Sequence, residues 1–175
     1  RSYANIKHIN LTYESSFRYL NVWLDKDKMD SILKNIISNA LKYTPDGGNV
    51  HVFTSETEDT WSIEVKDTGI GIPASEQKKL FKMHFRGSNA INSKVTGSGI
   101  GLLLVGKLVH LHKGKLNFSS MEGKGSCIKI TFPKGNKHFR KAIQRPQPQN
   151  ERIVYSASGV PINASATSSP ASSDI

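Results

Sequence analysis

The chain of 175 residues has a formal net charge of +10, one cysteine and no continuous run of about 18 apolar residues. These features exclude a disulfide framework, a metal site built from cysteines and an apolar stretch long enough to span a membrane. The 24 lysines and arginines are scattered instead of gathered in one stripe, so the charge suits a polyphosphate ligand as well as a nucleic acid.

The length suits one domain with a sizeable core. There is no leader for export, and a lone cysteine is compatible with a reducing compartment, so we expect a cytoplasmic domain with no direct membrane contact. Because the chain begins at Arg1 instead of a methionine, we also expect it to be a piece of a longer protein.

The first third of the chain predicts strands followed by one long helix. Short β-rich runs at Asn5 to Ser15 and Leu20 to Leu24 predict two strands. Asp25 is a suitable N-cap for the helix, which Pro45 and the following glycines should end. Steps of three and four residues separate the apolar positions Met29, Ile32, Leu33, Ile36, Ile37, Ala40 and Leu41.

The middle of the chain predicts a hairpin, a short helix and a polar loop. Alternating residues at Asn49 to Glu56 and Thr60 to Asp67 predict two antiparallel strands. Ser75 can cap a short helix that runs to Phe81. Residues 86–96 have no apolar periodicity, which is typical of a mobile loop.

A second long helix and a second hairpin follow. The helix should begin near Ser98 and stop at Gly114. Strands at Lys115 to Ser120 and Ser126 to Phe132 then flank a glycine turn, with a register that the sequence leaves open. Cys127 alternates with apolar residues in the last strand, so we expect it to be buried.

The composition changes beyond Pro133, where proline, glutamine, serine and alanine replace large apolar residues. We predict one domain over residues 1–135 and a linker or disordered tail over residues 136–175. The interleaved elements predict an α/β two-layer sandwich with about three helices packed on one face of a mixed, mainly antiparallel sheet.

Three polar side chains of the first long helix share one face. Asn35, Asn39 and Lys42 are four and three residues apart, which places them within about 60° of one another, opposite the apolar positions. Amide oxygens suit magnesium, and a lysine neutralises phosphate, so this face fits a metal-bound nucleotide. A solvent-facing polar surface would have the same spacing.

Asp67 ends a strand and is followed by Gly69 and Gly71, which let the backbone bend and approach a ligand. A carboxylate at such a bend can accept a hydrogen bond from the six-amino group of adenine, whereas guanine has an oxygen there. An ordinary turn of aspartate and glycine would have the same sequence.

The run from Gly97 to Leu102 precedes the second long helix, so its N–H groups and the positive helix end can hold phosphates. The preceding residues are polar and the glycines alternate, which excludes the dinucleotide-binding pattern. No Lys-Ser/Thr pair follows, so the Walker pattern is excluded too.

Taken in order, these motifs resemble the ATP-binding catalytic domain of bacterial sensor histidine kinases, in the superfamily of gyrase, chaperone, histidine-kinase and mismatch-repair ATPases with the Bergerat fold. The resemblance covers about Asn5 to Pro133. Its boxes are NIISNALKYTPDGG, DTGIGIP, LFKMHFRG, GSGIGL and EGKGSCIKITFP.

The resemblance implies a role for each matching position. Asn39 and Asn35 would hold magnesium, Lys42 would contact phosphate, Asp67 would bind adenine, and Arg86 would neutralise charge on the transferred group. Residues from about His84 to Thr96 would form a lid over ATP. The other implied nucleotide contacts are Tyr43, Gly69, Gly71, Ile72, Phe81, Gly97, Ser98, Gly99, Ile100, Gly101, Leu102 and Ser126.

Two positions qualify the resemblance. ATP-hydrolysing relatives have a glutamate where this chain has Asn35, so no general base for water is expected there and transfer to a partner is favoured. Residues 82–85 depart from the usual Glu-Arg pair and two aromatics of the family. Loss of the usual arginine removes one contact with phosphate or a neighbouring domain, so less than full catalytic activity is expected.

No histidine of the chain is followed by an acidic residue and the Thr-Pro spacing of a phosphoacceptor helix. The acceptor is therefore expected on a separate dimerisation domain, with a response-regulator receiver domain downstream. Alternatives are an anti-sigma-type serine kinase, a degenerate nucleotide-binding module and a nucleic-acid-binding protein. We expect ATP and magnesium as ligands and no nucleic acid.

Overall fold

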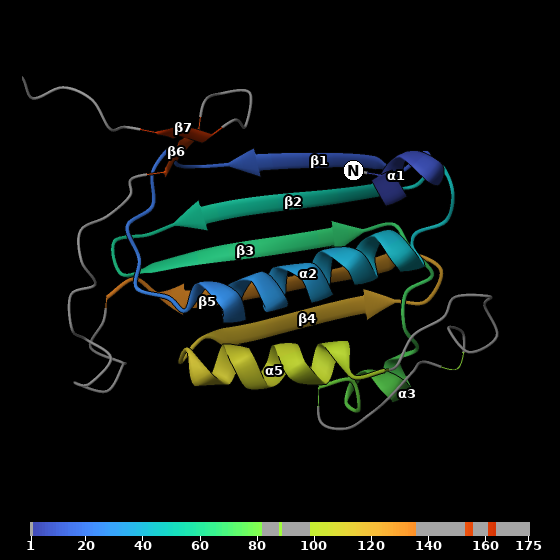
Figure 1. The fold of residues 1–175 in the computed structure, drawn as a ribbon. Helices are drawn as coiled ribbons and strands as arrows, with labels where there is room; N and C mark the ends of the chain where they lie inside the picture. Colours follow the sequence, from blue (N-terminus) through green and yellow to red (C-terminus); the bar gives the residue numbers. More distant parts are fainter. Residues whose placement is uncertain (1, 82–87, 89–98, 136–152, 156–160, 164–175) are drawn as a thin grey trace, which may run out of the picture. The chain divides into compact units, whose positions relative to one another are not determined.

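The computed structural model describes residues 2–81, 88, 99–135, 153–155 and 161–163. The chain divides into two compact units, residues 1–139 and 140–175. The first unit contains a five-stranded sheet in the order β1-β2-β3-β5-β4, which is drawn in Figure 1. Its strands are β1 (Asn10–Ser15), β2 (Asn49–Glu56), β3 (Thr60–Asp67), β4 (Lys115–Met121) and β5 (Gly125–Pro133).

Only the β1–β2 pair of this sheet is parallel, and the other three neighbouring pairs are antiparallel. Helices α2 (Lys26–Tyr43) and α5 (Gly101–Leu111) lie on one face of the sheet (Figure 1). Two short helices, α1 (Ser2–Ile6) and α3 (Ala74–Gln77), complete the described helices of this unit. The predicted two-layer sandwich with a mixed, mainly antiparallel sheet is confirmed.

The core lies between the sheet and the two long helices. Ile32 of α2, Val105 of α5 and Ile130 of β5 have no exposed surface. Along β5, Ile128 and Ile130 are buried while Cys127, next to Ile128, is half-exposed, because successive side chains of a strand point to opposite faces. Cys127 therefore lies on the other face of the sheet, and the prediction that it is buried in the core is wrong.

Helix α2 begins and ends as its sequence predicts. Asp25 has an extended backbone and its Oδ1 accepts a hydrogen bond from the Lys28 N–H at 3.1 Å, which satisfies one of the free donors of the first turn. Thr44 ends the helix one residue before Pro45. The buried positions Met29, Ile32, Ile36, Ala40 and Leu41 form the face that packs on the sheet.

The start of the chain differs from the prediction. Strand β1 begins at Asn10 instead of Asn5, because residues 2–6 form α1 and bury Ala4. Residues 20–24 form no strand, although Leu20 and Val22 pack against the core. The Trp23 N–H donates to the Lys134 carbonyl at 3.4 Å. An apolar run can thus contribute to the core without strand pairing.

Three further boundaries differ. Helix α3 ends at Gln77, well before Phe81, and Ser75 lies inside it and does not cap it. Helix α5 begins at Gly101 and ends at Leu111, three residues before Gly114. The second hairpin has the register that the sequence left open, with Met121 opposite Gly125.

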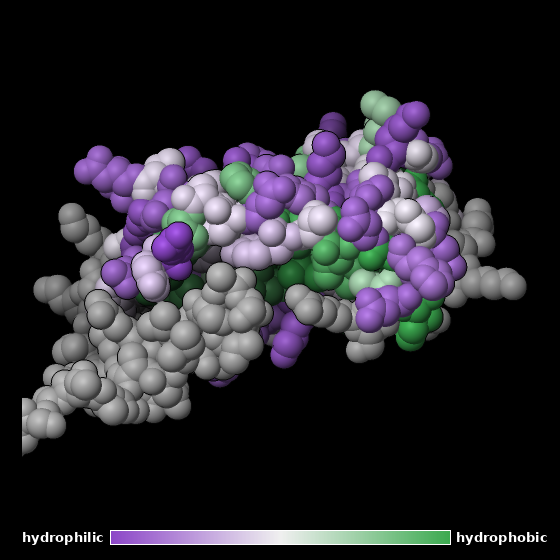
Figure 2. Space-filling view, turned by 90° about the horizontal axis from the view of Figure 1, so that it is seen from above, coloured by the Kyte–Doolittle hydropathy of each residue, from purple (hydrophilic) through white to green (hydrophobic). Residues whose placement is uncertain are grey.

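The described part of the second unit is one antiparallel pair, β6 (Ile153–Tyr155) with β7 (Pro161–Asn163). The boundary at residue 135 and the linker or disordered tail beyond it stay predictions. Among the described residues, no helix has both the length and the apolar character of a membrane span. Figure 2, turned so that Figure 1 is seen from above, shows mostly polar residues around a smaller apolar area.

We expect Asp25→Ala to lower the free energy of unfolding by about 1 kcal/mol, because the first turn of α2 loses its cap. Denaturation in urea measures the change, and Asp46→Ala at an exposed turn is the control that should change little. Hydrogen bonds from Lys28 lower the pKa of Asp25, so its contribution should disappear as pH falls through that lowered value. An equal loss in both variants would contradict the assignment of the cap.

Candidate functional site

The predicted polar face of α2 is not a solvent-facing surface. Asn35, Asn39 and Lys42 are all half-buried. A Cβ atom on Gly101, the first residue of α5, would lie 2.5 Å from Asn35 Oδ1, so the amide group occupies the space that a side chain would need. Asn35 of this face therefore lies beside the start of α5.

The loop after β3 is joined to the end of α2. The Ile70 N–H donates to the Tyr43 carbonyl at 3.0 Å. A Cβ atom on Gly69 would lie 2.6 Å from both that carbonyl oxygen and Asp67 Oδ1. Only glycine permits this approach, so the fold itself requires a glycine at this position of the motif.

Asp67 is half-buried at the end of β3, with one oxygen engaged and the other available. Its Oδ1 accepts the Gly69 N–H at 2.8 Å and the Ser126 N–H at 3.2 Å. Burial raises the pKa of Asp67, and the two backbone hydrogen bonds offset this only in part. Among the described residues none donates to Oδ2, which leaves an acceptor for a ligand amino group.

The glycine loop also lies against the turn of the second hairpin. Gly71 has a φ of +64°, and a Cβ atom there would lie 1.9 Å from the Met121 carbonyl oxygen. The Gly123 N–H donates to the Ile70 carbonyl at 2.8 Å. The loop is therefore held between α2 on one side and the β4–β5 turn on the other.

Two polar residues that the sequence analysis missed complete this arrangement. Ser120 Oγ accepts the Ile72 N–H at 2.8 Å and lies 2.9 Å from Ser126 Oγ. Gln77 of α3 donates to the carbonyls of Ile72 and Ser120 at 3.0 and 2.8 Å. Ser120 faces Ser126 across the hairpin, a signal that needed the register, and no sequence signal pointed to Gln77.

The remaining predicted residues fall into three groups. Gly99, with a φ of +72°, and exposed Ile100 precede α5, and half-buried Leu102 packs against the core. Phe81 packs edge-on against Phe118 at 5.5 Å, which is a core contact. The other calls lie outside the described residues, namely Arg86, Gly97, Ser98, the lid and the altered positions 82–85.

The comparison with known proteins decides the family. Residues 24–136 match the model of the histidine kinase-, DNA gyrase B-, and HSP90-like ATPases. The chain belongs to this family. The matched residues include Asn35, Asn39 and Lys42 of α2, the Asp67 loop and the start of α5.

This ATPase domain is a homologue of sensor histidine kinases. It is 40% identical over 129 residues to the sensor histidine kinase WalK of Bacillus subtilis, which is 73% of this chain and 21% of that protein. The adaptive-response sensory kinase SasA of Thermosynechococcus vestitus is 38% identical over 64% of this chain. The chain thus spans about a fifth of the length of WalK.

Solved structures of histidine kinases have the same fold. The mycobacterial sensor histidine kinase MprB matches with a TM-score of 0.65 and 26% identity, over 75% of this chain and 88% of that one. The catalytic domain of histidine kinase ThkA matches with a TM-score of 0.67 and 22% identity, over 78% and 86%. The sandwich described above is the fold of these ATPase domains.

The donor set of this ATPase domain fits a hard cation bound together with phosphate. The described residues contain no group of three or more histidine, cysteine, aspartate or glutamate side chains that could hold a metal. The half-buried amides of Asn35 and Asn39 offer neutral oxygens instead. Such oxygens suit magnesium when phosphates and water supply the other ligands.

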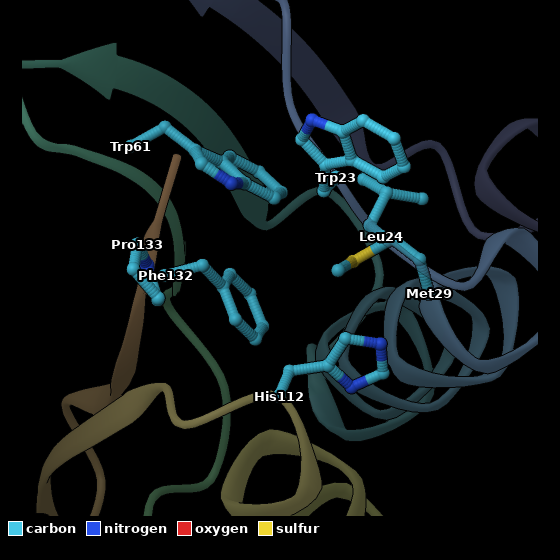
Figure 3. Close-up of a pocket in the computed structure, with 7 residues that line it drawn as sticks. All are labelled: Trp23, Leu24, Met29, Trp61, His112, Phe132 and Pro133. Atoms are coloured by element: carbon cyan, nitrogen blue, oxygen red, sulfur yellow. The ribbon is translucent and has the colours of Figure 1, made fainter. Parts of the chain in front are cut away.

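A hollow lies at the other end of the domain from the Asp67 loop, and all of its lining residues except Trp23 fall within the family match (Figure 1 and Figure 3). The hollow lies where α2 begins and α5 ends. Its lining residues are Trp23, Leu24, Met29, Trp61, His112, Phe132 and Pro133. None of them belongs to the three motifs, so the hollow is separate from the nucleotide site.

We expect Gly71→Ala to lower the free energy of unfolding by more than about 1 kcal/mol and to weaken nucleotide binding, because the added methyl group meets the Met121 carbonyl. Gly123→Ala is the matched control, since Gly123 has a φ of +71° but nothing within 4 Å of its Cβ position. Urea denaturation and nucleotide titration measure both variants. Equal effects would show that the contact with Met121 is unimportant.

Proposed function

We propose that this domain binds Mg-ATP and transfers its terminal phosphoryl group to a histidine on a separate dimerisation domain of the parent kinase, in two-component signalling in the cytoplasm. The observation that carries the proposal is that the 3.0 Å hydrogen bond from the Ile70 N–H to the Tyr43 carbonyl joins the Asp67 loop to the end of α2, while Gly101 at the start of α5 lies against the Asn35 side chain. Family membership supports it independently.

Each residue of the site has a proposed role. Oδ2 of Asp67, to which no described residue donates, accepts the adenine amino group, and Gly69 and Gly71 let the base approach the backbone. Tyr43 lies beside the base or ribose, with the Lys42 ammonium 5.3 Å from its ring centre. Asn39 and Asn35 hold magnesium, which neutralises charge on the phosphates when it is bound.

The start of α5 supports phosphate binding. The first N–H groups of a helix have no partner within it, and no side chain caps α5. Gly101 allows close approach of the backbone, and the positive end of the helix favours an anion. Gly97, Ser98 and Arg86 are proposed to complete the phosphate site, as the sequence analysis expects.

Transfer is favoured over hydrolysis. Asn35 contacts the Gly101 position and its Nδ2 donates to the Ser31 carbonyl at 2.7 Å. An amide cannot remove a proton from water, so the position where hydrolytic relatives have a glutamate lacks a general base. Phosphoryl transfer asks mainly for positioning and charge neutralisation, which this site provides.

Solved relatives support the ligand and the partner. The histidine kinase ShkA has been solved in complex with AMPPNP, and ThkA in complex with the response regulator protein TrrA. For this chain we propose the same class of ligand, and a response regulator that takes the phosphoryl group from the acceptor histidine.

The acceptor domain is proposed to dock on α5. Ile100, Leu104 and Leu111 are 41%, 38% and 55% exposed and recur at helical spacing. This apolar stripe starts beside the phosphate site, so a helix packed on it would bring a histidine close to the terminal phosphate.

Calorimetric titration with ATP, ADP and GTP, with and without magnesium, tests the proposal. We expect binding of both adenine nucleotides, stronger binding of ATP with magnesium, and no binding of GTP. Asp67→Asn should weaken ATP binding about ten- to a hundredfold, because a hydrogen bond to a charged group is worth about 1.5–3 kcal/mol.

The pH dependence checks the same residue. Since the pKa of Asp67 is raised above its ordinary value of 3.8, ATP affinity should begin to fall at a higher pH than for an ordinary aspartate. The Asp67→Asn variant should lack this decline. Absence of adenine nucleotide binding under every condition would overturn the proposed function.

Transfer to an isolated acceptor domain tests the second half of the proposal. We expect an acid-labile phosphohistidine, and a Leu104→Glu variant should transfer at least tenfold more slowly while its ATP affinity is unchanged. Tyr19→Glu, at a residue that is 70% exposed, is the control. An acid-stable product would favour a serine kinase, and ATP binding without transfer would favour a degenerate module.

A further inference from the structure

The last turn of α2 has an external partner that neither the motifs nor the family match includes. The last four carbonyls of a helix accept no hydrogen bond from within the helix and need donors from elsewhere. The Ala40 carbonyl accepts the Thr44 N–H at 3.1 Å and its hydroxyl at 2.7 Å, and the Tyr43 carbonyl accepts the Ile70 N–H. The remaining two are held by the Lys7 side chain.

Lys7 lies in the turn between α1 and β1, far from α2 in sequence. Its Nζ donates to the carbonyls of Leu41 at 3.3 Å and Lys42 at 3.2 Å, and also to that of Thr44. A cation at this end of a helix also interacts favourably with the helix dipole. One ammonium group thus satisfies three backbone carbonyls where α2 ends.

The backbone of Lys7 is fixed as well. The Gly47 N–H donates to the Lys7 carbonyl at 3.0 Å, and the Ile9 N–H donates to the carbonyl of Ala4, which is 3% exposed. His8 between them has a φ of +50°. The ammonium group is therefore presented from a turn that is anchored in the core and to the loop after α2.

The turn that Lys7 holds carries two nucleotide-site residues. Lys42 and Tyr43 are the last residues of α2, and the Tyr43 carbonyl is the acceptor that holds Ile70 of the glycine loop. Without the Lys7 ammonium group, the Leu41 and Lys42 carbonyls would lose this donor, and the last turn would be freer to fray. Lys42, Tyr43 and the loop would then lose their fixed positions together.

We propose that Lys7 is a positioning residue of the nucleotide site, which it holds by clamping the last turn of α2. The inference rests on nucleotide binding at this site, as proposed above. It assigns to Lys7 no contact with the nucleotide. Its effect on ATP reaches the ligand through Lys42, Tyr43 and the Tyr43–Ile70 hydrogen bond.

Three variants separate this role from general stability and from net charge. Lys7→Met removes the ammonium group and keeps a long apolar stem. Asp25→Ala weakens the same helix at its other end, where its cap is lost. Lys34→Met removes one positive charge from the exposed surface of α2.

We expect Lys7→Met to raise the Kd for Mg-ATP about tenfold, measured by calorimetry well below the unfolding temperature, while the two controls stay within about twofold of the unmodified chain. Lys7→Arg, which keeps a cation and donors, should recover part of the affinity. Amide exchange should show loss of protection at Ile70 in Lys7→Met only.

Equal affinity of Lys7→Met and the unmodified chain would overturn the proposal, and so would equal weakening in Lys7→Met and Asp25→Ala. If Lys7→Met does not fold, Lys7→Gln, with a neutral donor, carries the same comparison. Failure of the unmodified chain to bind ATP would instead overturn the proposed function, so the two failures are distinguishable.

Discussion

The hydrogen bond from the Ile70 N–H to the Tyr43 carbonyl joins the last residue of α2 to the glycine loop, and the nucleotide site depends on it. The bond requires the loop backbone to lie against the helix end, which only glycine permits at position 69. On its other side the loop meets the Met121 carbonyl at Gly71. A loop held by backbone on both sides keeps its shape before a ligand arrives, which reduces the ordering cost of binding.

Two opposing effects act on the charged form of Asp67. Its burial disfavours the charged form, and the N–H groups of Gly69 and Ser126 favour it without fully compensating. Both hydrogen bonds fall on one oxygen, so the other retains its acceptor capacity for a ligand. A hydrogen bond from a base amino group would supply the compensation that the protein leaves incomplete.

Both ends of α2 are tied to segments distant in sequence. At its start, the Asp25 N–H donates to His112 Nε2 at 3.4 Å, and His112 Nδ1 lies 2.9 Å from the Leu108 carbonyl, which joins α2 to the end of α5. At its other end, Lys7 and Ile70 hold the last turn. The helix that carries Asn35 and Asn39 is therefore held at both of its ends.

The sequence by itself determined the elements that local pattern controls. Alternation placed β2 and β3 at their observed bounds, apolar steps of three and four placed α2, and Asp25 marked its start. The order of the five boxes indicated the family, because short motifs and their spacing can be read directly along the chain. Only the tertiary structure showed that residues 20–24 form no strand, that Met121 faces Gly125, and that Lys7, Gln77 and Ser120 support the site. Each of these depends on a partner far away in the chain, and periodicity within a short window contains no information about distant partners.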